Sequence, residues 1–173
     1  MIDDVSRAVR DLIRGLDRAA LACLLPDPDG PRPYASLVLV ALDHDLSPIL
    51  LLSDLAEHSK AIAADPRVSL LFDATLGLDQ PLTGSRVSLV GRAVASDGTS
   101  DDERLKRRYL ARHPDASLYL AFKDFRFYRV VLERAHLVGG FGKIRWLDAH
   151  EQPRGRGLDR RSVRRGDRRG WKR

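Results

Sequence analysis

The sequence predicts an α+β fold in which an antiparallel sheet curls into a small barrel. Roughly six or seven short apolar segments alternate with turn residues at the spacing of hairpins. Three further segments repeat their apolar residues with helical periodicity. Closing the sheet removes the exposed edges that so many short strands would otherwise leave, which favours a barrel over an open sheet.

The first half of the chain supplies a helix and three strands. Residues 4–18 are predicted to be helical because their apolar side chains fall on one continuous stripe. Residues 19–25 are predicted to form a buried strand, and the proline-rich residues 26–31 a turn. The nearly all-apolar run 34–42 is typical of a strand buried on both faces, and we expect it to form a hairpin with a strand over 48–53.

A short helix and two strands follow. The helix ends at Asp65-Pro66, because the residue before a proline is disfavoured in a helix. Its start stays open: Asp54 and Glu57 have the spacing of a capping box, but the helix can also begin nearer His58. The two strands cover residues 67–73 and 86–94, and the second alternates between apolar and polar residues, so one of its faces meets solvent.

The last third is predicted to contain a charged helix and two more strands. The helix covers residues 99–112, and its acidic first turn suits the positive end of the helix dipole. Residues 116–122 add a further turn, and the strands cover residues 125–132 and 135–138. The glycine-rich segment 139–142 closes the ordered part of the chain.

Composition and charge divide the chain into two parts. Its 173 residues are 43% hydrophobic and 31% charged, which indicates one globular domain. Residues 151–173 contain ten basic and three acidic side chains, whereas the first 150 residues contain 20 basic and 21 acidic ones. We therefore predict a folded domain over residues 1–147 and a disordered, Arg/Gly-rich tail over residues 148–173. Any nucleic-acid binding is expected through this tail alone.

Several classes of protein are excluded by what the sequence lacks. The lone cysteine, Cys23, rules out a disulfide framework or a cysteine-ligated metal site within one chain. The histidines do not have metal-ligand spacing, so we predict no bound metal ion. We find no signal peptide, and no apolar stretch reaches the roughly 18 residues that a membrane span needs. We therefore expect a cytoplasmic protein that does not contact membranes.

Five polar residues are candidates for ligand binding. Ser59 and Lys60 place a hydroxyl and a cation where a strand passes into a helix, which suits a phosphate; the alternative is capping and a solvated helix face. Ser36 and Ser53 interrupt apolar strands and are candidates for the same site; the alternative is a hydrogen bond to a backbone carbonyl. Asp124, before an aromatic strand, can orient a ligand or simply begin the strand.

The order and spacing of several segments resemble the pyridoxamine-5′-phosphate-oxidase-like, FMN-binding split-barrel superfamily over roughly residues 10–147. The segments are 34–38 (YASLV), 48–53 (PILLLS), 58–62 (HSKAI) and 65–71 (DPRVSLL). Two later segments, 124–129 (DFRFYR) and 139–142 (GGFG), resemble the haem-utilisation branch of that superfamily more closely.

This resemblance implies a six-stranded split β-barrel with flanking helices, working as a homodimer with two ligand sites at the interface. It places the FMN phosphate against the positions of Ser59 and Lys60, with polar groups from the strands at Ser36 and Ser53. In haem-degrading members the position of His58 lies near the haem and that of Asp124 belongs to the site. Those members take their axial ligand from a histidine beyond the glycine-rich turn, whereas this chain has no histidine after His150.

The sequence therefore predicts an FMN-binding flavoprotein, an FMN-dependent oxidoreductase whose small-molecule substrate is unknown. The alternative is a haem-binding or haem-degrading protein on the same fold, and a further alternative is a non-enzymatic ligand-binding barrel. A homodimer is also expected because strands 34–42 and 86–94 are too apolar for one small sheet face. The predicted cofactor contacts are Ser36, Ser53, His58, Ser59, Lys60 and Asp124.

Overall fold

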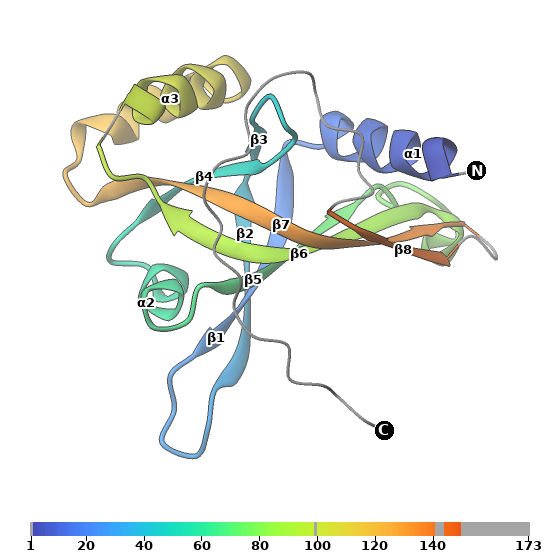
Figure 1. The fold of residues 1–173 in the computed structure, drawn as a ribbon, viewed down its shortest axis with the longest axis horizontal. Helices are drawn as coiled ribbons and strands as arrows, with labels where there is room; N and C mark the ends of the chain where they lie inside the picture. Colours follow the sequence, from blue (N-terminus) through green and yellow to red (C-terminus); the bar gives the residue numbers. More distant parts are fainter. Residues whose placement is uncertain (1, 99, 141–143, 150–173) are drawn as a thin grey trace.

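One antiparallel sheet organises the molecule. The computed structural model describes residues 2–98, 100–140 and 144–149, so the predicted basic tail lies outside the described residues from position 150 onward. The sheet has eight strands in the order β2-β1-β5-β6-β7-β4-β3, and β8 pairs with β7 beside this path (Figure 1). The strands are β1 (Arg18–Leu25), β2 (Arg32–Leu39), β3 (Ala41–Leu42), β4 (Pro48–Ser53), β5 (Arg67–Asp73), β6 (Ser85–Ala95), β7 (Phe125–Gly139) and β8 (Ile144–Asp148).

Helices pack at separate places around this sheet. The α-helices are α1 (Ile2–Gly15), α2 (Glu57–Ala64) and α3 (Ser100–Arg112), and the 3-10 helices are η1 (Pro81–Thr83) and η2 (Pro114–Ala121). Helix α1 contacts β6, α2 contacts β1 and β2, and α3 contacts β3, β4 and β7. Figure 1 shows α1 and α3 near opposite ends of the curled sheet and the β1–β2 hairpin extending beyond it. The architecture confirms the predicted α+β split barrel with flanking helices, but the sheet has eight strands rather than the six that the resemblance implies.

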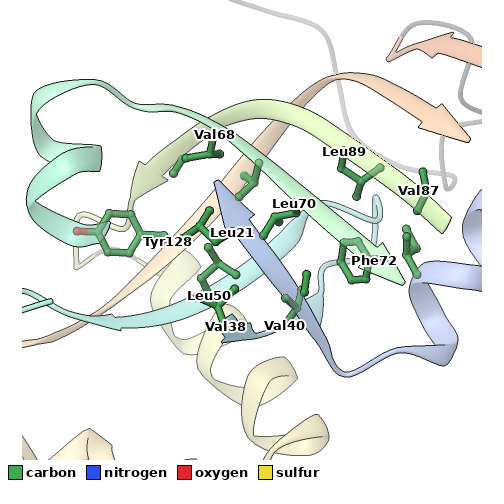
Figure 2. Close-up of a cluster of buried hydrophobic side chains, with 14 of the residues drawn as sticks. Leu21, Val38, Val40, Leu50, Val68, Leu70, Phe72, Val87, Leu89 and Tyr128 are labelled. Atoms are coloured by element: carbon green, nitrogen blue, oxygen red, sulfur yellow. The ribbon is translucent and has the colours of Figure 1, made fainter. Parts of the chain in front are cut away.

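The main core fills the inside of the curl. Figure 2 shows buried aliphatic and aromatic side chains from most of the strands meeting there. Leu21, Leu50, Leu70, Phe72 and Leu89 have no exposed surface. Each buried side chain of this size contributes about 1.5–3 kcal/mol to folding, so this cluster is the main source of the barrel's stability.

The predicted hairpin between residues 34–42 and 48–53 is confirmed only at its closed end, where two residue pairs join β3 to β4. The apolar run divides into β2 and β3, and β2 pairs along its whole length with β1. Only the two residues of β3 pair with β4, whose main partner is β7. The expected burial on both faces is wrong, because Leu37 and Leu39 of β2 are 69% and 41% exposed. The type of residue alone does not show whether an apolar side chain of a strand lies on the outer face of the sheet or in the core.

Strand β7 and its neighbour β8 also differ from the prediction. One continuous strand replaces the two predicted over residues 125–132 and 135–138. Glu133 and Arg134 do not end it: Glu133 is the extra residue where the pairing with β6 shifts register, and the exposed side chains of the two residues form ion pairs with Arg92 and Asp148 on the adjacent strands. The pairing of β8 with β7 was not predicted, since ordered structure was expected to close at the glycine-rich turn.

Several element boundaries were predicted more closely. The first helix ends at Gly15 rather than residue 18, and α3 begins one residue after the predicted start. Helix α2 begins at Glu57 after Ala56, and no side chain caps it, so Asp54 and Glu57 do not form a capping box.

Among the described residues, no helix is long and apolar enough to span a membrane.

Candidate functional site

A pocket lies where the barrel is split, between strands β2 and β4. Within the described residues no backbone ladder joins these two strands, although they approach each other. The pocket has a volume of about 240 Å³. Its lining combines the facing sides of β2 and β4 with α2, α3, η2 and the start of β7: Leu37, Val38, Leu39, Leu51, Leu52, Ser53, Ala56, His58, Tyr109, Ala116, Tyr119 and Phe125.

His58 is the only imidazole in this lining. It lies in the first turn of α2, and its Nδ1 is 3.1 Å from the hydroxyl oxygen of Ser36 on β2. Burial lowers the pKa of His58 from 6.5, so the ring is neutral at physiological pH. If Nδ1 carries the proton and donates to Ser36, then Nε2 is a free acceptor. The barrel therefore presents an oriented neutral imidazole to the pocket.

Ser53 and Asp124 form a second polar feature. The Ser53 hydroxyl, at the end of β4, lines the pocket and donates to Asp124 Oδ2 at 2.5 Å. The backbone N–H of Leu55 donates to the same hydroxyl oxygen at 3.2 Å, and the backbone N–H of Asp54 donates to the Asp124 carbonyl at 2.7 Å. These bonds tie the end of β4 to the start of β7, and they fix Ser53 with its proton directed at a carboxylate.

Aromatic side chains from α3, η2 and β7 form one wall of the pocket. Tyr119 of η2 stacks on Phe125, with ring centroids 5.4 Å apart and planes inclined by 21°. Tyr109 of α3 is 3% exposed, and burial raises its pKa to about 12 while a hydrogen bond from the Leu51 backbone opposes that shift. The phenol is therefore neutral. A pocket lined by apolar side chains, flat aromatic rings and an imidazole suits a planar, largely apolar ligand.

Ser59 and Lys60 do not line the pocket. Ser59 is 3% exposed, and its hydroxyl has no hydrogen-bond partner among the described residues. Lys60 is exposed, and its Nζ forms an ion pair with Glu57 at 2.7 Å. The helical turn thus sends His58 to the pocket, Ser59 to the interior and Lys60 to solvent. In a single copy of the chain, the two residues predicted to hold a phosphate are separated from each other and from the pocket.

The structure brings together four of the six residues predicted to contact a cofactor. Ser53 and His58 line the pocket, and Ser36 and Asp124 are hydrogen-bonded to them. Sequence reasoning missed the aromatic wall from Tyr109 and Tyr119. The available signal was weak: Tyr109 follows Leu105 by four residues and so shares its helix face, which is equally typical of an ordinary core position.

The sequence and the fold have relatives among known proteins. The sequence is 38% identical over 108 residues to "Non-canonical heme oxygenase HOZ, chloroplastic" of Arabidopsis thaliana, covering 62% of this chain and 32% of that protein. The structure resembles a heme binding protein from Mycobacterium smegmatis with a TM-score of 0.77 and 28% identity, covering 85% of this chain and 59% of that one. This chain therefore spans about a third of the curated relative's length and less than two thirds of that solved chain.

A more distant solved structure supports the fold alone. A putative pyridoxamine 5'-phosphate oxidase from Listeria innocua has a TM-score of 0.58 at 15% identity, covering 79% of this chain and 99% of that one. The family model described as "CREG, beta-barrel" matches residues 2–152, which is most of the sequence. The curled antiparallel sheet, its split between β2 and β4 and this match lead to one assignment: the chain belongs to the CREG β-barrel family.

Proposed function

We propose that this protein binds haem in the pocket between β2 and β4, with His58 as the iron ligand. The observation that carries the proposal is a neutral imidazole facing an apolar, aromatic pocket. Histidines that bind metals commonly use their second ring nitrogen to donate a hydrogen bond, and the Ser36 hydroxyl lies 3.1 Å from Nδ1 of His58, where it can accept one. Haem held in this way would supply a redox-active iron whose behaviour depends on its axial ligand and on the surrounding polarity.

The ligand named for the two sequence relatives supports haem over FMN. One is named a heme oxygenase and the other a heme binding protein. A phosphate is normally held by charge-assisted hydrogen bonds, yet no lysine or arginine is among the residues that line the pocket in the described chain. Lys60, the expected phosphate ligand, is paired with Glu57 outside the pocket. The FMN-dependent oxidoreductase stays the alternative, supported by likeness of fold.

A second copy of the chain is part of the proposal. A volume of about 240 Å³ lies below the roughly 300–1,000 Å³ of pockets that enclose a small-molecule ligand, so one chain leaves a macrocycle partly uncovered. Leu37 and Leu39 line the pocket and are also exposed on the outer face of β2. Covering that apolar face with a partner would bury these side chains and complete the site at the same time.

The experiment is a titration of the full chain with haemin and, separately, with FMN. We expect haemin to bind saturably with a shifted Soret band, and FMN to show no saturable change in its absorbance or fluorescence. His58→Ala should weaken haemin binding about tenfold or more and move the Soret band, because the iron loses its protein ligand.

Two matched variants separate the possible ligands. His150→Ala tests the later histidine, at the place where haem-degrading relatives are expected to carry their axial ligand, and it should leave the spectrum unchanged. Lys60→Ala should leave haemin binding unchanged, whereas it should weaken FMN binding by about 1–3 kcal/mol if FMN is held as the sequence predicts. Tight FMN binding that depends on Lys60, without haemin binding, would overturn the haem proposal. A Soret shift in His150→Ala but not in His58→Ala would show that the iron ligand is His150 rather than His58.

A further inference from the structure

A buried carboxylate lies behind the aromatic wall of the pocket. Asp43, in the turn between β3 and β4, has a side chain only 1% exposed. Arg104 of α3 forms a direct ion pair with it, Arg108 Nε lies 3.8 Å away, and Arg129 Nε of β7 lies 3.6 Å away. The backbone N–H of His44 donates to its Oδ1 at 2.8 Å. One carboxylate thus joins the turn, the helix and the central strand.

Helix α3 makes similar polar contacts along its length. Arg104, Arg108 and Arg112 follow one another at intervals of four residues and so form one stripe. Arg108 Nε donates to the Leu42 carbonyl at 2.7 Å, and Arg112 Nη2 donates to the Arg14 carbonyl at 3.2 Å. Arg104 and Arg108 therefore fasten α3 to the end of β3 and the turn after it, Arg112 fastens α3 to the end of α1, and Asp43 receives the contact nearest the start of the helix.

The apolar contacts of α3 and η2 are separate from the main core. The buried apolar residues around the main core include none from these two elements. Leu105, Tyr109 and Ala116 belong to a smaller cluster together with Ile49 and Phe127. Because the apolar contacts of α3 are confined to this smaller cluster, the position of the helix depends more strongly on its polar contacts. The residues that α3 and η2 place in the pocket, Tyr109, Ala116 and Tyr119, depend on that position.

We infer that Asp43 is a positioning residue that fixes the α3–η2 wall of the ligand pocket through Arg104, Arg108 and Arg129. Replacing Asp43 by asparagine leaves three guanidinium groups around a buried neutral amide. The loss of one partner from a cluster of this kind destabilises the contacts that the cluster makes. The effect is local, because the main core does not include the helix. The wall loosens, and the pocket loses its shape, while the strands of the barrel keep theirs. The ligand-binding consequence rests on the proposed function; the loosening of the wall does not.

The test compares Asp43→Asn with Asp65→Asn. Asp65 is a matched control because it also pairs with an arginine, Arg67, in a turn, but between α2 and β5 and without an ion pair to α3 among the described residues. Hydrogen–deuterium exchange of the full chain should show amides of α3 and η2 exchanging about tenfold faster in Asp43→Asn, with β5 and β6 changed less than about twofold. Haemin affinity should fall about fivefold or more, and Asp65→Asn should change neither quantity.

A milder variant and a double variant keep the inference testable if Asp43→Asn does not fold. Arg104→Lys keeps the charge but loses the planar guanidinium, so it should loosen the wall less than Arg104→Gln does. Asp43→Asn combined with Arg104→Gln should be less severe than the sum of the two single variants.

Two results would overturn the inference. In one, exchange rises equally in α3 and in β5, which makes Asp43 a general stabilising residue. In the other, exchange in α3 and η2 does not change. If the unaltered protein fails to bind haemin, the proposed function is wrong, and the exchange measurement still decides the role of Asp43.

Discussion

Gly91 lies where the pairing between β6 and β7 shifts register, between Val90 and Gly91. A Cβ at this position would meet the backbone carbonyl oxygen of Val131 at 2.2 Å and its carbon at 3.0 Å. Because both atoms belong to the backbone of the central strand, no side-chain rotation relieves the contact. The two longest strands approach this closely only because residue 91 has no side chain.

We therefore expect Gly91→Ala to lower the free energy of unfolding by about 1–3 kcal/mol, as overpacking does. Urea denaturation measures this as a lower midpoint with an unchanged slope. Gly15→Ala is the control, because a Cβ there meets nothing within 4 Å, and its change should stay within about 0.5 kcal/mol. Equal stabilities of the two variants would show that the barrel adjusts at the register shift.

His58 gives the site a pH dependence. Burial lowers its pKa below 6.5, so the unfolded chain takes up a proton at a higher pH than the folded chain does. The stability due to the neutral ring is therefore complete above about pH 6.5 and is lost as the pH falls through the folded pKa. His58→Gln should remove this part of the pH dependence of unfolding between pH 7.5 and 5.5. NMR titration of the His58 ring gives an independent check, and a midpoint above 6.5 would contradict the prediction.

At the scale of elements, α1 packs on one end of the barrel through a small number of buried residues. Val9 and Ile13 lie one helical turn apart and are 3% and 2% exposed, and both belong to the main core. Isolated helices of this length are marginal in water, so α1 depends on this contact with the sheet. The stripe of apolar residues in the sequence was sufficient to predict both the helix and its buried face.

Ile13→Ala should destabilise the protein by about 2–5 kcal/mol, since it removes buried methyl groups and leaves a cavity. Thermal and urea unfolding measure the effect. Asp11→Ala lies on the exposed side of the same helix and should change stability by less than about 0.5 kcal/mol. If the two variants were equally stable, the helix would not be held through its apolar face.

Across the whole molecule, the outer face of the sheet carries a band free of lysine, arginine, aspartate and glutamate, although the Arg134 guanidinium lies over its last ring, Trp146. Direct cross-strand partners connect six strands in a single row: Leu37, Ala20, Leu71, Ser88, His136 and Trp146. Leu37 and Trp146 at the ends of the row are 69% and 50% exposed. A band of this extent on a sheet, continuous with the pocket through Leu37, is the surface that the proposed second copy would cover.

We expect sedimentation to give about twice the 19.4 kDa chain mass at micromolar concentration. Leu71→Glu should shift the protein to the monomer, because it buries an unpaired charge in the middle of the band. Leu76→Glu is the control, since Leu76 is 97% exposed in the β5–β6 loop and outside the row. A monomeric unaltered protein would contradict both the dimer and the shared pocket.

The sequence by itself determined the class of fold and most of the elements, and four of the residues it singled out lie at or beside the candidate pocket. Local periodicity, prolines and polar interruptions are readable from the chain because each depends on neighbouring residues. Only the tertiary structure decided that β2 pairs with β1, that Leu37 faces outward, and that Lys60 turns away from His58. It also brought Tyr109 and Tyr119 to the pocket and three arginines to Asp43. These contacts join residues far apart in sequence, and strand order and helix docking fix them rather than local preference.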